Sequence, residues 1–156
     1  MDTLALKNQK ILITGGKGYL GSHLATALQN EGAEIYILSL EPSENEKEYQ
    51  VDITDAEQVK QVVHSIQPDF VYHLAASIDR RRDFDQYEQM MKINVDGTLN
   101  LLKALQGTQY KNFIFTSSSE VYGNNQSPFH EDQPLLPTSP YSLSKVYGEH
   151  LIRTFS

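Results

Sequence analysis

Residues 10–21 of the chain read KILITGGKGYLG, and this stretch decides the fold. The first five residues are a short, mostly β-branched run that ends at glycines, which predicts a buried strand. The glycines fit both Gly16-x-Gly18-x-x-Gly21 and Gly15-x-x-Gly18-x-x-Gly21. Glycines at such a strand-to-helix turn allow a tight turn, close approach of a pyrophosphate and close packing of helix on strand. The helix N-terminus adds unpaired N–H groups and a positive dipole end. The pattern therefore predicts dinucleotide binding, with a glycine turn needed only for packing as the alternative.

Strands and helices are expected to alternate along the rest of the chain. Further strands are predicted at residues 34–40, 49–51, 70–74 and 112–116, and helices at 19–31, from 55 to about 66, at 86–106 and after the proline-rich loop 127–140. This alternation is typical of βαβ units, so we predict an α/β fold with a Rossmann-like, doubly wound, mainly parallel sheet. No repeat or linker indicates a second domain, and residues 1–156 are expected to form one NAD(P)-binding domain.

Composition narrows the class of protein. The 156 residues are 39% hydrophobic and 21% charged, which is ordinary for a globular domain. The net charge of −7 argues against a broad basic surface for nucleic acid. With no cysteine there is no disulfide and no thiolate, and no metal site is predicted. No apolar run approaches the ~18 residues of a membrane span. A cytoplasmic location without membrane contact is therefore expected, since the first residues also lack the apolar core of a signal peptide.

Tyr141 and Lys145 form a candidate catalytic pair. They lie four residues apart, which places the phenol and the ammonium on one face of a helix. A nearby ammonium favours the phenolate, and this makes a tyrosine useful as a general acid or base. The alternative is a solvated helix face. The glycine loop in the same chain favours the catalytic interpretation.

Two acidic positions bear on which dinucleotide binds. An acidic residue about 20 residues beyond the glycine loop often holds the ribose hydroxyls. Ser39 occupies that position here, Glu41 follows two residues later, and no arginine is nearby for a 2′-phosphate. NAD is therefore favoured, and NADP stays possible. Asp52 at the end of the third strand either binds the adenine amine or caps the helix that follows.

Six motifs in order resemble the extended short-chain dehydrogenase/reductase family, whose members include NAD-dependent nucleotide-sugar epimerases and dehydratases. They cover the chain from about Lys10 to its last residue and comprise Thr14–Gly21, Asp52–Asp55, His73–Ala76, Asn94–Thr98, Ser117–Gly123 and Pro140–Lys145.

The resemblance implies a role for each matching residue. Tyr141 would take the proton from a sugar hydroxyl while hydride passes to nicotinamide, and Lys145 would hold the nicotinamide ribose. Ser118 would bond the reacting oxygen, because a hydroxyl both donates and accepts. The positions assigned to the cofactor, from the glycine loop and the resemblance together, are Gly15, Gly18, Tyr19, Leu20, Gly21, Ser39, Asp52, Ile53, Leu74, Ala75, Ala76, Asn94, Ser117, Tyr141 and Lys145.

Three further features leave alternatives open. Dehydratases of the family commonly carry Asp-Glu after the catalytic hydroxyl residue, whereas Ser119 and Glu120 stand here. Glu120 is thus a catalytic candidate or a solvated loop carboxylate. His73 is expected to pack at a strand end rather than act as a base. The run from Arg80 to Arg82 either meets a ligand phosphate or is exposed charge.

The resemblance also implies a missing part. Family enzymes continue past the Tyr-x-x-x-Lys helix with more strands and a domain for the nucleotide-sugar, so the usual C-terminal strands and substrate domain are lacking here. A sheet edge and apolar helix faces are then expected to lie uncovered, or to meet a second copy through the helices at 86–106 and 138–155. The candidate functions are an NAD(P)-binding domain of an epimerase or dehydratase, a truncated dinucleotide-binding module without turnover, and a fragment that binds no cofactor.

Overall fold

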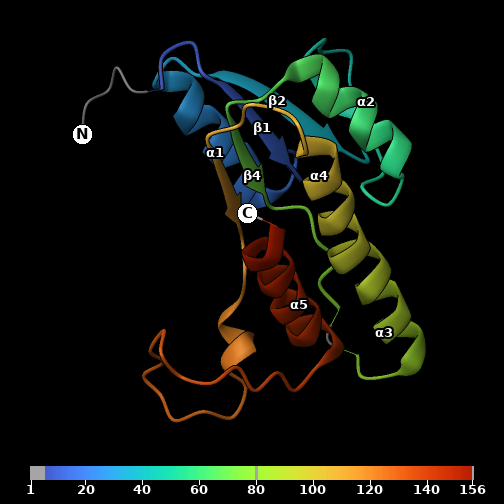
Figure 1. Ribbon diagram of the computed structural model, residues 1–156, viewed down its shortest axis with the longest axis vertical. Helices are drawn as coiled ribbons and strands as arrows, with labels where there is room; N and C mark the ends of the chain where they lie inside the picture. The colour runs from blue at the N-terminus through green and yellow to red at the C-terminus, as the bar shows by residue number, and fades with distance from the viewer. Residues whose placement is uncertain (1–5, 80, 156) are drawn as a thin grey trace.

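The computed structural model describes residues 6–79 and 81–155, in which helices pack on both faces of one sheet (Figure 1). In chain order the elements are β1 Lys10–Thr14, α1 Tyr19–Asn30, β2 Glu34–Ser39, β3 Glu48–Gln50, α2 Ala56–Ile66, β4 Phe70–His73, α3 Phe84–Met90, the π-helix η2 Met91–Asp96, α4 Gly97–Leu105, β5 Asn112–Phe115, the 3-10 helix η3 Ser119–Tyr122 and α5 Pro140–Phe155.

The sheet is parallel throughout and runs in the order β3-β2-β1-β4-β5. The prediction of a Rossmann-like, doubly wound α/β fold is thereby confirmed. Strand order reverses between β1 and β4, and open sheets bind ligands at such a switch point, beyond the carboxyl ends of the strands. Thr14, the last residue of β1, pairs with Leu38 on β2 and His73 on β4. The ends of three strands therefore meet beneath the glycine loop.

The two faces of β1 belong to different cores. Ile11 and Ile13 pack with Leu28 of α1 on one face, whereas Leu12 packs with residues of α2 and α4 on the other. All three β1 side chains are fully buried. A strand covered on both faces reads as a continuous apolar run, which is why residues 10–14 were recognisable from the sequence.

The predicted helix at 86–106 differs from the structure. The helical segment begins at Phe84, where the Asp83 carboxylate accepts the N–H of Gln86 at 2.8 Å, and residues 91–96 form a π-helix within it. Gly97 follows this π-helix, and a Cβ there would lie 2.8 Å from Ile53. The glycine lets the helix approach the loop after β3, and it does not break the helix as a glycine can elsewhere.

β5 is the last strand of the sheet and pairs only with β4 among the described residues. Ile114 on this strand is 37% exposed. On the helices, Phe84 is 88% exposed, and Tyr87 of α3 and Tyr147 of α5 are 39% and 41% exposed. The expected open edge and apolar helix surfaces are thus present. No helix in residues 6–79 and 81–155 is long and apolar enough to span a bilayer.

Candidate functional site

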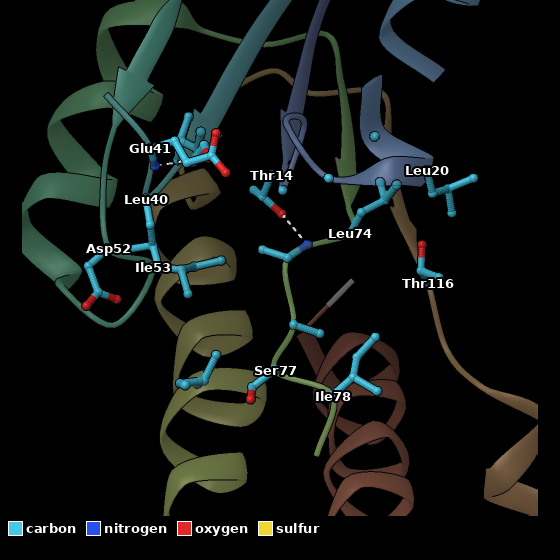
Figure 2. Close-up of a pocket in the computed structure, with 18 of the residues that line it drawn as sticks. Thr14, Leu20, Leu40, Glu41, Asp52, Ile53, Leu74, Ser77, Ile78 and Thr116 are labelled. Carbon is cyan, nitrogen blue, oxygen red and sulfur yellow. Dashed lines mark hydrogen bonds between the residues drawn. The ribbon is translucent and has the colours of Figure 1, made fainter. Parts of the chain in front are cut away.

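A cavity of about 760 Å³ opens at the carboxyl ends of β1, β2 and β4 (Figure 2). Its wall runs from the glycine loop, past the ends of β2 and β3, to α5. Of the fifteen positions predicted for a cofactor, thirteen line it: Gly15, Gly18, Tyr19, Leu20, Gly21, Ser39, Asp52, Ile53, Leu74, Ala75, Ala76, Tyr141 and Lys145. The groove is therefore assembled from distant segments that share one edge of the sheet.

The glycine loop has no room for side chains at two positions. Gly15 has φ +70°, and a Cβ there would lie 2.9 Å from the Ala75 nitrogen. A Cβ on Gly21 would lie 2.4 Å from the Gly15 carbonyl oxygen. Gly18 caps α1 without a side-chain hydrogen bond, and the first turn holds no acidic residue. The helix N-terminus therefore presents backbone N–H groups and a positive dipole end to the groove, as an anionic ligand requires.

The far wall carries the residues predicted for the adenosine end. Ser39 Oγ accepts the N–H of Glu41 at 3.2 Å, and both residues line the cavity beside Leu40 (Figure 2). Asp52 is exposed in the same wall, and its Oδ1 accepts the Thr54 N–H at 2.9 Å. The helix cap is Asp55, which accepts the N–H groups of Glu57 and Gln58. Capping of α2 thus belongs to Asp55, and Asp52 faces the groove.

Tyr141 and Lys145 lie one turn apart on α5 and line the opposite end. Tyr141 is 8% and Lys145 is 3% exposed. Lys145 Nζ donates to the Thr116 carbonyl at 2.8 Å and lies 5.9 Å from the centre of the Tyr141 ring. Burial lowers the pKa of Lys145 to about 8, so the ammonium stays largely protonated at neutral pH. The predicted pair is therefore present as one phenol and one cation at the groove wall.

The serines after β5 lie outside the cavity wall. Ser118 caps η3, where its Oγ accepts the Glu120 N–H at 3.1 Å, and a hydroxyl that accepts can still donate its own proton. Ser117 Oγ donates instead to the Glu149 carboxylate of α5, which is unlike the cofactor contact predicted for it. Glu120 is half-buried in the first turn of η3. The sequence did not predict η3, because its single turn carries no periodic pattern.

His73 and Asn94 are buried behind the groove rather than in its wall. His73 bonds Thr14 Oγ1 at 2.7 Å and Thr98 Oγ1 at 2.9 Å. Burial, helped by the charge of Lys145, lowers the pKa of His73 to about 3, so its ring is neutral. Asn94 bonds the backbone of Ser77, four residues beyond the end of β4. Each bonds a residue of the cavity wall, Thr14 or Ser77, and neither lines the cavity itself.

Two other predictions concern charge. Arg81 forms a hydrogen-bonded ion pair with Asp79 at 2.9 Å and is exposed, while Arg80 lies outside the described residues. The exposed-charge interpretation fits Arg81 better than a ligand contact. No group of three or more metal-ligating side chains occurs within residues 6–79 and 81–155.

Several groove residues were missed from the sequence, notably Thr116, Ser77 and Ile93. Thr116 directly follows β5, so the rule that parallel strands bind ligands at their carboxyl ends could have found it. Ile93 lies in the π-helix, whose register no sequence period indicated.

Known proteins resemble this chain in sequence over nearly its whole length. A model of the NAD-dependent epimerase/dehydratase family matches residues 11–156. A dTDP-D-glucose 4,6-dehydratase of Dictyostelium discoideum is 34% identical across 94% of this chain and 40% of its own length. A UDP-glucuronate 4-epimerase of Thermodesulfobacterium geofontis is 30% identical across 92% of this chain and 50% of its own.

Solved structures share the fold as well. The UDP-glucose 4-epimerase of Thermus thermophilus in complex with NAD has a TM-score of 0.85 and 28% identity, covering 94% of this chain and 50% of its own. The chain thus spans about half the length of the relatives it matches, or less.

Proposed function

The chain belongs to the NAD-dependent epimerase/dehydratase family, and on that premise we propose that it is the NAD-binding domain of an enzyme acting on nucleotide-sugars. The observation that carries the proposal is the continuous groove, with the glycine loop at one end and Tyr141 and Lys145 at the other. The groove matches an extended ligand with an anionic centre.

The residues of the glycine loop fit a pyrophosphate. Gly15 and Gly21 leave the space that a Cβ would fill, and the start of α1 supplies backbone donors. Asp52, Ser39 and Glu41 would hold the adenosine. The Glu41 carboxylate in the wall favours NAD over NADP, because it would repel a 2′-phosphate.

The chemistry would take place at the α5 end. Bound NAD supplies the acceptor for a hydride from a sugar carbon. Tyr141 would act as a phenolate that the Lys145 ammonium stabilises; it would take the proton of the sugar hydroxyl and so become a neutral phenol. Ser118 holds the reacting oxygen, and Glu120 is the carboxylate available for a later proton transfer. Such transient oxidation would permit epimerisation or elimination at the sugar.

A binding module without turnover is the second candidate. It is favoured by the coverage, since the chain spans about half of its relatives or less and the groove accounts for a cofactor rather than a sugar. The relatives named above are dehydratases and epimerases of dTDP- and UDP-sugars. A nucleotide-sugar is therefore the substrate class to test, and part of its site would come from outside these residues.

Isothermal titration calorimetry with NAD and NADP tests the proposal. We expect saturable NAD binding and weaker NADP binding, and we expect Glu41→Gln to narrow that difference. If neither NAD nor NADP bound, both candidate functions would be contradicted. Turnover of UDP- and dTDP-sugars, measured with and without a C-terminal half, separates the enzyme from the binding module.

A homodimer through residues 86–106 and 138–155 remains part of the proposal. Exposed Tyr87 and Tyr147 on α3 and α5 support it, because large exposed apolar patches mark interfaces. Light scattering over a concentration series should show a dimer, and a monomer at every concentration would refute it.

A further inference from the structure

One buried set of hydrogen bonds connects the groove floor to α5 and has no role in the reaction proposed above. Its side chains are Thr14, His73, Asn94, Thr98 and Ser144, each at most 2% exposed. They come from β1, β4, η2, α4 and α5. Buried polar groups are costly unless each finds a partner, so the bonding pattern is constrained.

The pattern has one consistent direction. The Asn94 carbonyl can only accept, so the Thr98 hydroxyl donates to it, at 2.6 Å. Thr98 Oγ1 must then accept from His73 Nε2, at 2.9 Å. His73 Nδ1 is left as an acceptor, and the Thr14 hydroxyl donates to it at 2.7 Å. Thr14 Oγ1 in turn accepts the Ala75 N–H at 3.1 Å (Figure 2).

Asn94 extends the same set to α5. Its Oδ1 accepts the Ser77 N–H at 2.8 Å, which fixes the orientation of the amide. Its Nδ2 donates to the Ser77 carbonyl at 3.0 Å and to Ser144 Oγ at 2.9 Å. Ser144 donates to the carbonyl of Tyr141 at 2.7 Å. One residue therefore ties the segment after β4 to the helix of Tyr141 and Lys145.

We propose that His73 is a positioning residue: as the Nε2–H tautomer it joins Thr14 to Thr98 and so aligns the Ala75 edge of the groove with α5. The inference rests on the proposed NAD binding, because the aligned edge is the floor of that groove. An imidazole suits this position, since it offers one donor and one acceptor on opposite sides of a rigid ring. A ring protonated at both nitrogens would need two acceptors, and Thr14 already directs its proton at Nδ1.

The first measurement is the tautomer itself, by two-bond ¹H–¹⁵N correlation on the ¹⁵N-labelled chain. The other four of the five histidines are exposed, so His73 is the ring whose N–H is protected from solvent exchange. We expect one neutral Nε2–H form at neutral pH. A Nδ1–H tautomer or a doubly protonated ring would overturn the proposal, whatever the outcome of any mutation.

The second measurement is NAD affinity after a change remote from the groove. Thr98→Val keeps the shape but removes the hydroxyl, so His73 Nε2–H loses its acceptor. We expect NAD binding to weaken roughly tenfold, and Nδ1–H rings to appear in the NMR spectrum; tenfold corresponds to about 1.4 kcal/mol. Thr98→Ser keeps the hydroxyl and should restore both properties.

Thr26→Val is the matched control. Thr26 Oγ1 also donates to the carbonyl four residues earlier, at 3.0 Å, but on the exposed face of α1. This variant should bind NAD as the wild type does. If folded Thr98→Val binds NAD with wild-type affinity, the positioning role alone is refuted. If the wild type does not bind NAD, the proposed function fails and this inference fails with it.

Discussion

At the glycine loop the groove is shaped by glycines, which have no side chain to fill it. At α5 it is shaped by side chains that are buried and hydrogen-bonded. Tyr19 and Leu20 beside the loop are 85% and 56% exposed, while Tyr141 and Lys145 are 8% and 3% exposed. The first region would recognise its ligand through backbone N–H groups. The second would act through a phenol and a cation, and burial lowers the pKa of the cation. The same kind of substitution should therefore damage the two regions by different physical routes.

The largest effect is expected at α5, from Tyr141→Phe. Removing the hydroxyl removes the proposed proton acceptor, and general acid–base groups contribute about 10²–10⁴-fold in rate. Turnover of a nucleotide-sugar should fall by that order in a protein long enough to hold the substrate. NAD affinity, measured by calorimetry, should change little because the ring is retained. Unchanged turnover would remove Tyr141 from the mechanism.

At the glycine loop, Gly15→Ala should act by crowding. Its Cβ would approach the Ala75 nitrogen to 2.9 Å, so the groove floor must shift, and we expect NAD affinity to fall by roughly tenfold to a hundredfold, about 1.4–2.7 kcal/mol. Gly107→Ala is the control, because Gly107 also has positive φ, +83°, with nothing within 4 Å of a Cβ. Both variants should lose about 1–2 kcal/mol of stability through left-handed strain. Equal NAD affinity in the two variants would show that the close approach to Ala75 has no bearing on binding.

A third effect concerns stability rather than activity or NAD affinity, and it is a pH dependence at α5. Burial lowers the pKa of Lys145 from 10.5 to about 8, so from about pH 8 to 10.5 the unfolded state binds more protons than the folded state. Stability therefore rises with pH across this window, by about 3 kcal/mol at about 1.4 kcal/mol per pKa unit.

Lys145→Met should abolish that rise and be more stable than the wild type near neutral pH, where the wild type buries a cation. Denaturant unfolding at several pH values measures both effects. Lys103→Met on the exposed side of α4 is the control and should follow the wild type. If the free energy of unfolding rises with pH as much in Lys145→Met as in the wild type, Lys145 is not the source of the rise.

Both regions could be predicted from the sequence. The glycine loop, β1 and the start of α1 depend on neighbouring residues, so local chemistry was sufficient. The Tyr141/Lys145 pair was found by its helical spacing, and the family resemblance drawn from the six motifs is confirmed by the match over residues 11–156. In each case a short stretch contained the whole signal.

The supporting contacts could not be predicted in this way. The bond from His73 to Thr14 spans 59 residues, and that from Asn94 to Ser144 spans 50. Such pairs depend on the tertiary fold, so sequence spacing indicates neither. Asp52 and Asp55 illustrate the same limit at short range. Both carboxylates precede α2, and only the backbone conformation decides that Asp55 caps it.

The π-helix η2 affects how the continuous helical segment of α3, η2 and α4 packs on its neighbours, α2 and α5. Hydrogen bonds there run from residue i to i+5, so the turn holds about one residue more than an α-turn, and one residue rotates an α-helix by about 100°. The side chains after η2 are thus out of phase with those before it. Consistently, α3 packs on α5, whereas α4 packs mainly on α2 and also contacts α5. Deleting a single residue from 91–96 would shorten this helical segment. It would also rotate α4 relative to α3, so that one of the two would turn away from the helix on which it packs.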